Sequence, residues 1–214
     1  MRIIAIILSF LFLTSCNHKK PVNTLLKSDS LRVDSKYVKG TWISYFQTFK
    51  TPLGVTIKFK ILNDSSYVIQ WGDSLKLKTY PETFHLDGHE TWIPRYIAGN
   101  KNYIVLRQGC GNPCWRGYFL PLNDSLKLHV INEYLDFDLD NDLVAYINDS
   151  DNIGVINLRT NLTEQHILNG CVSAFPGNCI DSLSIKNKTL KYKWFPKTTM
   201  NSKVGIIKIE KINI

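Results

Sequence analysis

Three aspartates alternate along one short segment, an arrangement that can bind a hard cation. Asp136, Asp138 and Asp140 are separated by single residues, so on a β-strand their carboxylates would share one face. A bound cation such as Ca²⁺ would relieve the repulsion between them. We predict no metal here and interpret the segment as a charged strand that protects a sheet edge, with a calcium site as the alternative.

A second group of potential metal ligands occupies residues 85–90, with the sequence His-Leu-Asp-Gly-His-Glu. Zinc binds imidazole and carboxylate groups. Gly88 would interrupt a helix, however, so the helical H-E-x-x-H arrangement is excluded. Because Asp87-Gly88 is typical of a hairpin turn, we expect a solvent-exposed hairpin tip and no cofactor.

A serine in a short motif raises the question of nucleophilic catalysis. Gly72-Asp73-Ser74-Leu75 resembles the nucleophile motif of the GDSL hydrolases, which implies Ser74 as the nucleophile. That family supplies the proton-accepting His from an Asp-x-x-His segment, and no Asp stands three residues before any His in this chain. We therefore predict that the protein is not an enzyme and that Gly-Asp forms a hairpin turn between strands at 68–71 and 75–79.

Four of the five cysteines are expected to form disulfides. Cys110, Cys114, Cys171 and Cys179 are an even number, which suits an oxidising compartment. We predict the local pairs Cys110–Cys114 and Cys171–Cys179, because each pair flanks a stretch rich in turn residues. Cross-linking of the two loops to each other and a four-thiolate metal site are the alternatives.

The fifth cysteine, Cys16, ends an apolar N-terminal segment. Residues 3–13 are almost wholly apolar and have the length of a signal-peptide core, too short to cross a bilayer. Leu13-Thr14-Ser15-Cys16 resembles the lipobox of bacterial lipoproteins. The resemblance implies that residues 1–15 are a signal peptide removed on export and that Cys16 is lipidated.

The same resemblance implies a protein anchored in the bacterial cell envelope through its lipid. Asn17 replaces the Asp that often retains such proteins in the inner membrane, which favours the outer membrane facing the periplasm. Residues 16–36 would comprise the lipidated Cys and a flexible tether, and residues 37–214 a single domain.

The chain is basic, and the balance hardly changes when the leader is removed. One of the 26 Lys and Arg residues lies in the leader, which leaves 25 against 18 Asp and Glu residues. The lysines are scattered rather than clustered, so we interpret them as a solvated surface of mixed sign. An exported chain without a nucleic-acid-binding motif is not expected to bind nucleic acid.

From residue 37 onward, runs that alternate apolar and polar residues predict strand after strand. The runs lie at 55–61, 75–78, 126–130, 190–194 and 206–212. Alternation of this kind is typical of antiparallel sheets with one buried face. Asn-Asp-Ser turns at 63–65, 123–125 and 148–150 separate further strand-like runs, which makes the domain all-β.

Internal similarity suggests repeated units of about four strands. Residues 100–106, 140–146 and 187–193 each begin with a polar turn that opens into a strand, and in the first two units a last strand carries His129 or His166. This spacing resembles the blades of β-propellers, so we predict antiparallel, propeller-like repeats. A lipocalin-like barrel, suggested by Gly40-Thr41-Trp42, and an irregular β-sandwich are the alternatives.

We therefore predict a non-enzymatic envelope lipoprotein that binds a partner through its loops. The candidate surface is the loop at 108–118, with Trp115, Arg116 and Tyr118 as contacts to a protein or a glycan. The membrane itself would be a partner only through the lipid anchor. The alternative functions are a lipocalin-like carrier of a small apolar ligand and, least favoured, a hydrolase.

Overall fold

The structure is a computed structural model of the 214-residue chain, and it describes part of that chain. The described ranges are 36–38, 41–43, 48–63, 66–85, 93–111, 114–148, 152–169, 179–196 and 205–214. The expected signal peptide, Cys16, the tether up to residue 35 and most of the expected hairpin tip at 85–90 lie outside them. Val33–Ile214 form one compact unit.

The described residues form eighteen strands in five antiparallel sheets, and they contain no α-helix. This confirms the prediction of an all-β, antiparallel chain. Sheet A contains β1 (Lys36–Val38) and β2 (Thr41–Ile43). Sheet B contains β3 (Thr48–Lys50), β4 (Thr56–Asn63), β5 (Ser66–Asp73), β6 (Lys76–Thr79) and β7 (Phe84–His85).

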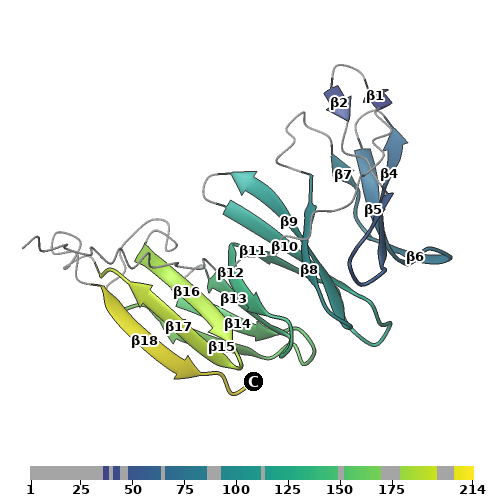
Figure 1. The fold of residues 1–214 in the computed structure, drawn as a ribbon. Helices are drawn as coiled ribbons and strands as arrows, with labels where there is room; N and C mark the ends of the chain where they lie inside the picture. The colour runs from purple at the N-terminus through teal and green to yellow at the C-terminus, as the bar shows by residue number, and fades with distance from the viewer. Residues whose placement is uncertain are drawn as a thin grey trace, which may run out of the picture. The chain divides into compact units, whose positions relative to one another are not determined.

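Sheets C, D and E follow in chain order, and in each of them consecutive strands lie side by side (Figure 1). Sheet C contains β8 (Arg95–Gly99), β9 (Tyr103–Gly111), β10 (Cys114–Pro121) and β11 (His129–Asn132). Sheet D contains β12 (Tyr134–Asp138), β13 (Leu143–Asn148), β14 (Asn152–Asn157) and β15 (Thr163–Ile167). Sheet E contains β16 (Ile180–Lys186), β17 (Thr189–Trp194) and β18 (Ile206–Lys211).

The turns that the sequence predicts connect paired strands. The three Asn-Asp-Ser segments link β4 to β5, β10 to β11 and β13 to β14. The Gly-Asp hairpin is also confirmed, because Asp73 pairs with Lys76 and its Oδ1 accepts a hydrogen bond from the Leu75 backbone N–H at 3.0 Å. Two strand starts differ from the alternation pattern: Leu75 lies in the turn, 95 % exposed, and β11 begins only at His129.

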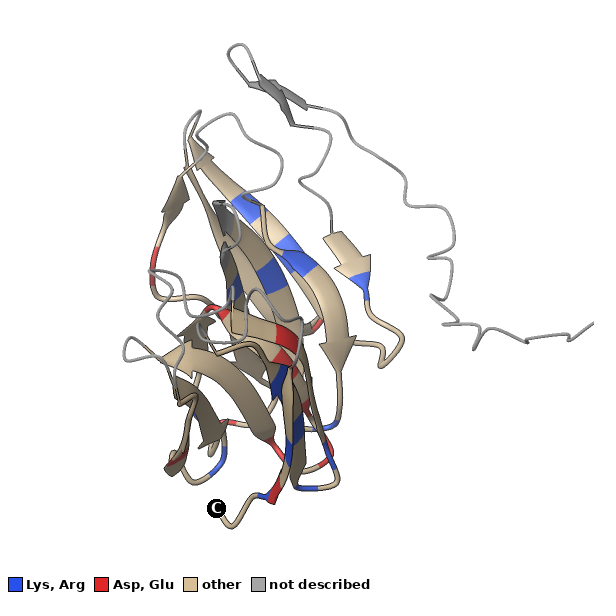
Figure 2. Cartoon of the chain, turned by 90° about the vertical axis from the view of Figure 1, so that its left-hand side faces the viewer, with Lys and Arg blue, Asp and Glu red and all other residues tan. Residues whose placement is uncertain are grey.

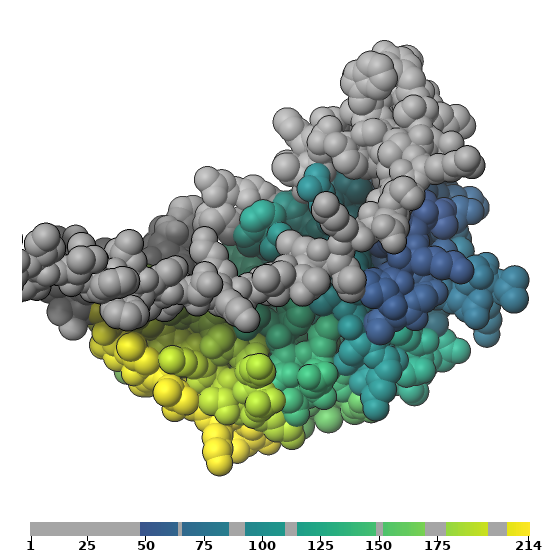
Figure 3. Space-filling model, viewed as in Figure 1, coloured from purple at the N-terminus to yellow at the C-terminus, as the bar shows by residue number. Residues whose placement is uncertain are grey.

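Three hydrophobic clusters lie between successive sheets, so sheets B to E pack in chain order (Figure 3). The cluster between sheets B and C includes Ile57, Trp71 and Leu106. Phe119 and Val144 meet between sheets C and D, and the cluster between sheets D and E contains, among others, Ala145, Val155, Tyr192 and Trp194. None of these sheets closes on itself, so a lipocalin-like barrel is wrong for the described part of the chain, and four sheets packed in succession differ from a two-sheet sandwich.

The central strands of the inner sheets are buried on both faces, whereas the outer sheets have one solvated face. In β9 of sheet C, Tyr103 and Val105 face sheet D, and Ile104 and Leu106 face sheet B. In β4 of sheet B, exposed residues such as Lys58 and Lys60 alternate with buried ones. Lys and Arg therefore recur at intervals along the strands, with uncharged residues between them (Figure 2).

Equivalent turns in sheets C and D are joined by a buried polar contact. Asn102 and Asp142 are each the third residue of the turn-to-strand segment that the sequence repeat predicts, and the Asn102 Nδ2 donates to Asp142 Oδ1 at 3.1 Å. Arg159 donates to Asp142 Oδ2 from Nε at 3.0 Å and from Nη2 at 2.8 Å. Asp142 is 4 % exposed, and its φ of 56° places it in a left-handed turn. Through these hydrogen bonds its buried carboxylate links sheet C, sheet D and the loop that carries Arg159.

A backbone carbonyl makes a second contact between the same two sheets. The Leu158 carbonyl accepts hydrogen bonds from the Tyr103 hydroxyl at 3.0 Å and from His129 Nε2 at 2.8 Å. A carbonyl can only accept, so His129 is in the tautomer protonated at Nε2. Burial lowers the pKa of His129 below its ordinary value of 6.5, with the bond to Leu158 opposing this effect.

We predict that Asp142→Ala lowers the free energy of unfolding by about 2–4 kcal/mol, because it leaves the buried Asn102 amide without its acceptor and places alanine at a positive φ. Asp142→Asn keeps an acceptor and tolerates this φ, so the loss should be smaller. Arg159→Ala removes a half-exposed partner and should cost about 1 kcal/mol or less. Urea denaturation measures all three, and equal losses for Asp142→Ala and Arg159→Ala would contradict the assignment.

The pKa of His129 predicts a pH dependence of stability. Because the folded pKa lies below the unfolded value of 6.5, the contribution is complete above pH 6.5 and declines as the pH falls below it. The slope attributable to this residue is at most about 1.4 kcal/mol per pH unit. His129→Gln retains a donor for Leu158 and should flatten this decline in denaturation series below pH 6.5. An unchanged slope would show that His129 is not responsible.

Candidate functional site

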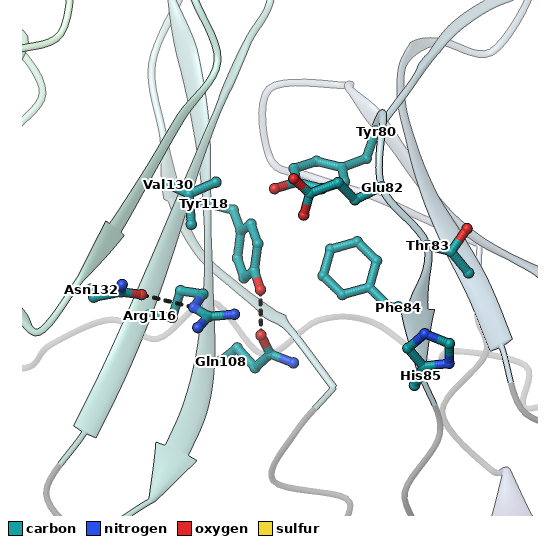
Figure 4. A pocket seen from close by; sticks show the side chains of 10 residues that line it. All are labelled: Tyr80, Glu82, Thr83, Phe84, His85, Gln108, Arg116, Tyr118, Val130 and Asn132. Atoms are coloured by element: carbon teal, nitrogen blue, oxygen red, sulfur yellow. Dashed lines mark hydrogen bonds between the residues drawn. The ribbon is translucent and has the colours of Figure 1, made fainter.

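A cavity of about 510 Å³ opens between sheets B and C (Figure 4). This volume lies within the range typical of small-molecule sites. One wall comes from sheet B and the segment between β6 and β7, and it consists of Tyr80, Glu82, Thr83, Phe84 and His85. The other wall comes from sheet C and consists of Gln108, Arg116, Tyr118, Val130 and Asn132.

Three aromatic rings form the apolar part of the cavity. Tyr80, Phe84 and Tyr118 contact one another, with ring centroids 5.0 Å, 5.7 Å and 5.4 Å apart for the three pairs. Tyr80 is 4 % and Tyr118 is 2 % exposed, so packing fixes both rings. Phe84 also stacks on Tyr67 at 5.1 Å, which ties this part of the cavity to the core of sheet B.

Three polar side chains cross sheet C in one row. The register places Gln108 and Asn132 on either side of Arg116, on β9, β11 and β10. The Arg116 Nε donates to Asn132 Oδ1 at 2.8 Å, and the Tyr118 hydroxyl donates to Gln108 Oε1. These bonds orient the amides and the guanidinium before any ligand arrives.

Both phenols of the cavity are neutral at physiological pH. Burial, together with the nearby Glu82 carboxylate and Tyr118, raises the pKa of Tyr80 to about 12, against a smaller opposite effect of Arg116. Burial also raises the pKa of Tyr118, although its hydrogen bond with Arg116 opposes the rise. The permanent charges on the walls are therefore the Arg116 cation and the Glu82 anion.

The prediction of a loop at 108–118 is wrong for the described residues of that range, which lie on β9 and β10. The structure also separates the three contact residues that the sequence suggests. Arg116 and Tyr118 both line the cavity. Trp115 points to the opposite face of β10, because successive residues of a strand alternate, and it is 46 % exposed. There the Arg107 guanidinium lies 4.6 Å from the centre of its ring. Trp115 is thus part of a different surface.

Sequence reasoning missed most of the cavity. Tyr80, Glu82, Gln108 and Asn132 belong to no motif, and only the pairing register brings Gln108 and Asn132 beside Arg116. Once β9, β10 and β11 are aligned, that row could have been found. The opposite wall depends on how sheet B packs against sheet C.

Two of the three alternating aspartates bind the backbone of sheet E. Asp136 Oδ2 accepts a hydrogen bond from the Ile185 backbone N–H at 2.9 Å. Asp138 Oδ2 accepts from Asn141 Nδ2 at 2.9 Å and from the Lys188 N–H at 3.4 Å. Within the described ranges, no group of three or more His, Cys, Asp or Glu residues could hold a metal ion. These carboxylates join sheet D to sheet E.

The remaining candidate residues are only partly described. Cys179 is disulfide-bonded and 1 % exposed, but the side chains of the other four cysteines lie outside the described residues, so both predicted pairs stay predictions. The Ser74 hydroxyl donates to the neighbouring Asp73 Oδ1 at 3.4 Å, within an exposed hairpin turn.

Comparisons with known proteins do not assign this chain to a family. The described residues include no helix long and apolar enough to cross a membrane. Comparisons with protein families, curated proteins and solved structures found no match. The side chains that line the cavity between sheets B and C are therefore the basis for inferring what it binds.

Proposed function

We propose that this protein is a non-enzymatic binding module of the bacterial cell envelope, anchored by lipid on Cys16, that takes a glycan in the cavity between sheets B and C. The observation that carries the proposal is the row of Gln108, Arg116 and Asn132 beside the half-buried aromatic ring of Phe84. Amides and a guanidinium match sugar hydroxyls, and an aromatic ring matches the apolar face of a sugar.

The Arg116 cation on the sheet C wall favours a glycan that carries a carboxylate, bound away from the Glu82 anion on the opposite wall. No ion pair among the described residues involves Arg116, whose Nε binds Asn132 and whose guanidinium also hydrogen-bonds Tyr118. The terminal amino groups of a guanidinium can bind a carboxylate with two parallel hydrogen bonds. Thr83 and Gln108 supply further polar groups for hydroxyls.

We also infer that sheets B to E are blades of an open propeller. Support comes from the repeated turn-to-strand segments and from clusters that join each sheet to the next. The outer faces of sheets B and E both expose lysines, such as Lys58 and Lys60 on one and Lys191 on the other. Because like charges repel, these faces do not favour a closed ring.

A protein partner is the second candidate, and Trp115 favours it. This side chain is 46 % exposed and is covered on one face by Arg107, and tryptophan with arginine is a frequent combination at interface hot spots. The surface lies on the opposite face of β10 from the cavity, so the two hypotheses predict effects of different residues.

Binding of an acidic oligosaccharide tests the proposed site. We expect trigalacturonate to bind more tightly than the neutral cellotriose in isothermal titration calorimetry. Arg116→Ala should weaken trigalacturonate binding by about tenfold or more, because a charge-assisted hydrogen bond contributes about 1.5–3 kcal/mol. Arg107→Ala is the matched control, since Arg107 lies on the adjacent strand and on the opposite face. Equal effects of the two substitutions, or no binding of either sugar, would refute the glycan proposal.

Intact mass spectrometry tests the lipid anchor. We expect the protein extracted from bacterial membranes to begin at Cys16 and to carry acyl chains. Cys16→Ser should keep residues 1–15 attached and remove the acyl mass. A membrane-extracted protein that retains residues 1–15 without acylation would contradict the anchor and leave the glycan test unaffected.

A further inference from the structure

The outer face of sheet E combines cations with two exposed isoleucines. Ile207 and Ile209 of β18 are 60 % and 65 % exposed. The register places Lys193 opposite Ile207 and Lys191 opposite Ile209, so all four side chains share one face. Trp194, which follows on β17, faces the other way and belongs to the cluster between sheets D and E. The mixed face therefore points away from sheet D.

Lysines at the ends of the strands extend this face. Lys186 lies two residues beyond Ser184 on β16, and Lys211 lies two residues beyond Ile209 on β18. Lys193 forms an ion pair with Asp181 at 2.8 Å. The ion pairs between described residues include none for Lys186, Lys191 or Lys211. The face is therefore strongly positive.

The corresponding face of sheet B shows what is unusual here. Lys58 and Lys60 are exposed there too, but Lys58 pairs with Gln70, which in turn pairs with Thr79, and Lys60 pairs with Val68. Val68 is half-buried, so these pairs place no fully exposed apolar side chain beside the lysines. On β18 the neighbours of the lysines are isoleucines, and exposed apolar residues on an edge strand invite association.

We propose that the outer face of sheet E, formed by Ile207, Ile209 and the surrounding lysines, contacts an anionic lipid surface. Isoleucine side chains can enter the boundary between headgroups and acyl chains, while lysine amines reach the phosphates. The inference rests on the proposed lipid anchor, which would hold the domain within reach of a bilayer. Charge complementarity selects anionic over zwitterionic headgroups.

Lysine labelling on vesicles tests the inference with the full-length lipidated chain. The chain is bound to vesicles of phosphatidylcholine, alone or mixed with phosphatidylglycerol, and acetylated with an N-hydroxysuccinimide ester. We expect acetylation of Lys186, Lys191 and Lys211 to slow by about tenfold on the anionic vesicles, and high salt to restore it. Lys58 and Lys60 are the internal control and should react equally on both.

Two variants separate this surface from general attraction to charge. Ile207→Ser with Ile209→Ser should return the labelling rates on anionic vesicles to those on phosphatidylcholine, and Lys58→Ser with Lys60→Ser should change nothing. Equal labelling on both vesicle types, or protection that arises without vesicles from a second copy, would overturn the inference. A chain that floats with neither vesicle type would instead refute the anchor, so the two failures are distinguishable.

Discussion

Burial of the central strands of sheets C and D on both faces is the constraint on which the rest of the structure depends. A strand with both faces buried cannot place charged groups between its apolar residues, and residues 103–106 and 143–145 are accordingly buried without interruption. Polar groups at these interfaces must find partners within the protein. Asp142 with Asn102, and the Leu158 carbonyl with Tyr103, meet this requirement and also set how the two sheets align.

The same constraint explains which strands the sequence predicts well. The outer strands β4, β17 and β18 alternate because one face is solvated, and alternation gives them from sequence alone. Central strands lack this pattern. The polar turns that precede β9 and β13 resemble each other in sequence, and this resemblance predicts the two strands. Alternation over 126–130 placed a strand start too early: Leu126 and Leu128 pack as irregular chain against the clusters, and pairing begins at His129.

The cavity could be anticipated only in part. The sequence indicates Arg116 and Tyr118 as contact residues because they lie beside a segment rich in cysteine and aromatic residues. It indicates Trp115 equally, but successive residues of a strand point to opposite faces, so Trp115 lies on the other face of β10. The wall with Tyr80 and Glu82 depends on packing between sheets separated in sequence, and no local pattern encodes that contact.

The order of the sheets relates the two proposed surfaces to each other. The cavity lies between sheets B and C, and the isoleucine face lies on the far side of sheet E, so the packed interfaces from C to D and from D to E stand between them. Contact of sheet E with a bilayer would therefore leave the cavity uncovered by lipid. The proposed lipid anchor, which precedes sheet A in the sequence, would add a second attachment. Arg116 would then meet glycans in the surrounding solvent, with sheet D between it and the lysines of sheet E.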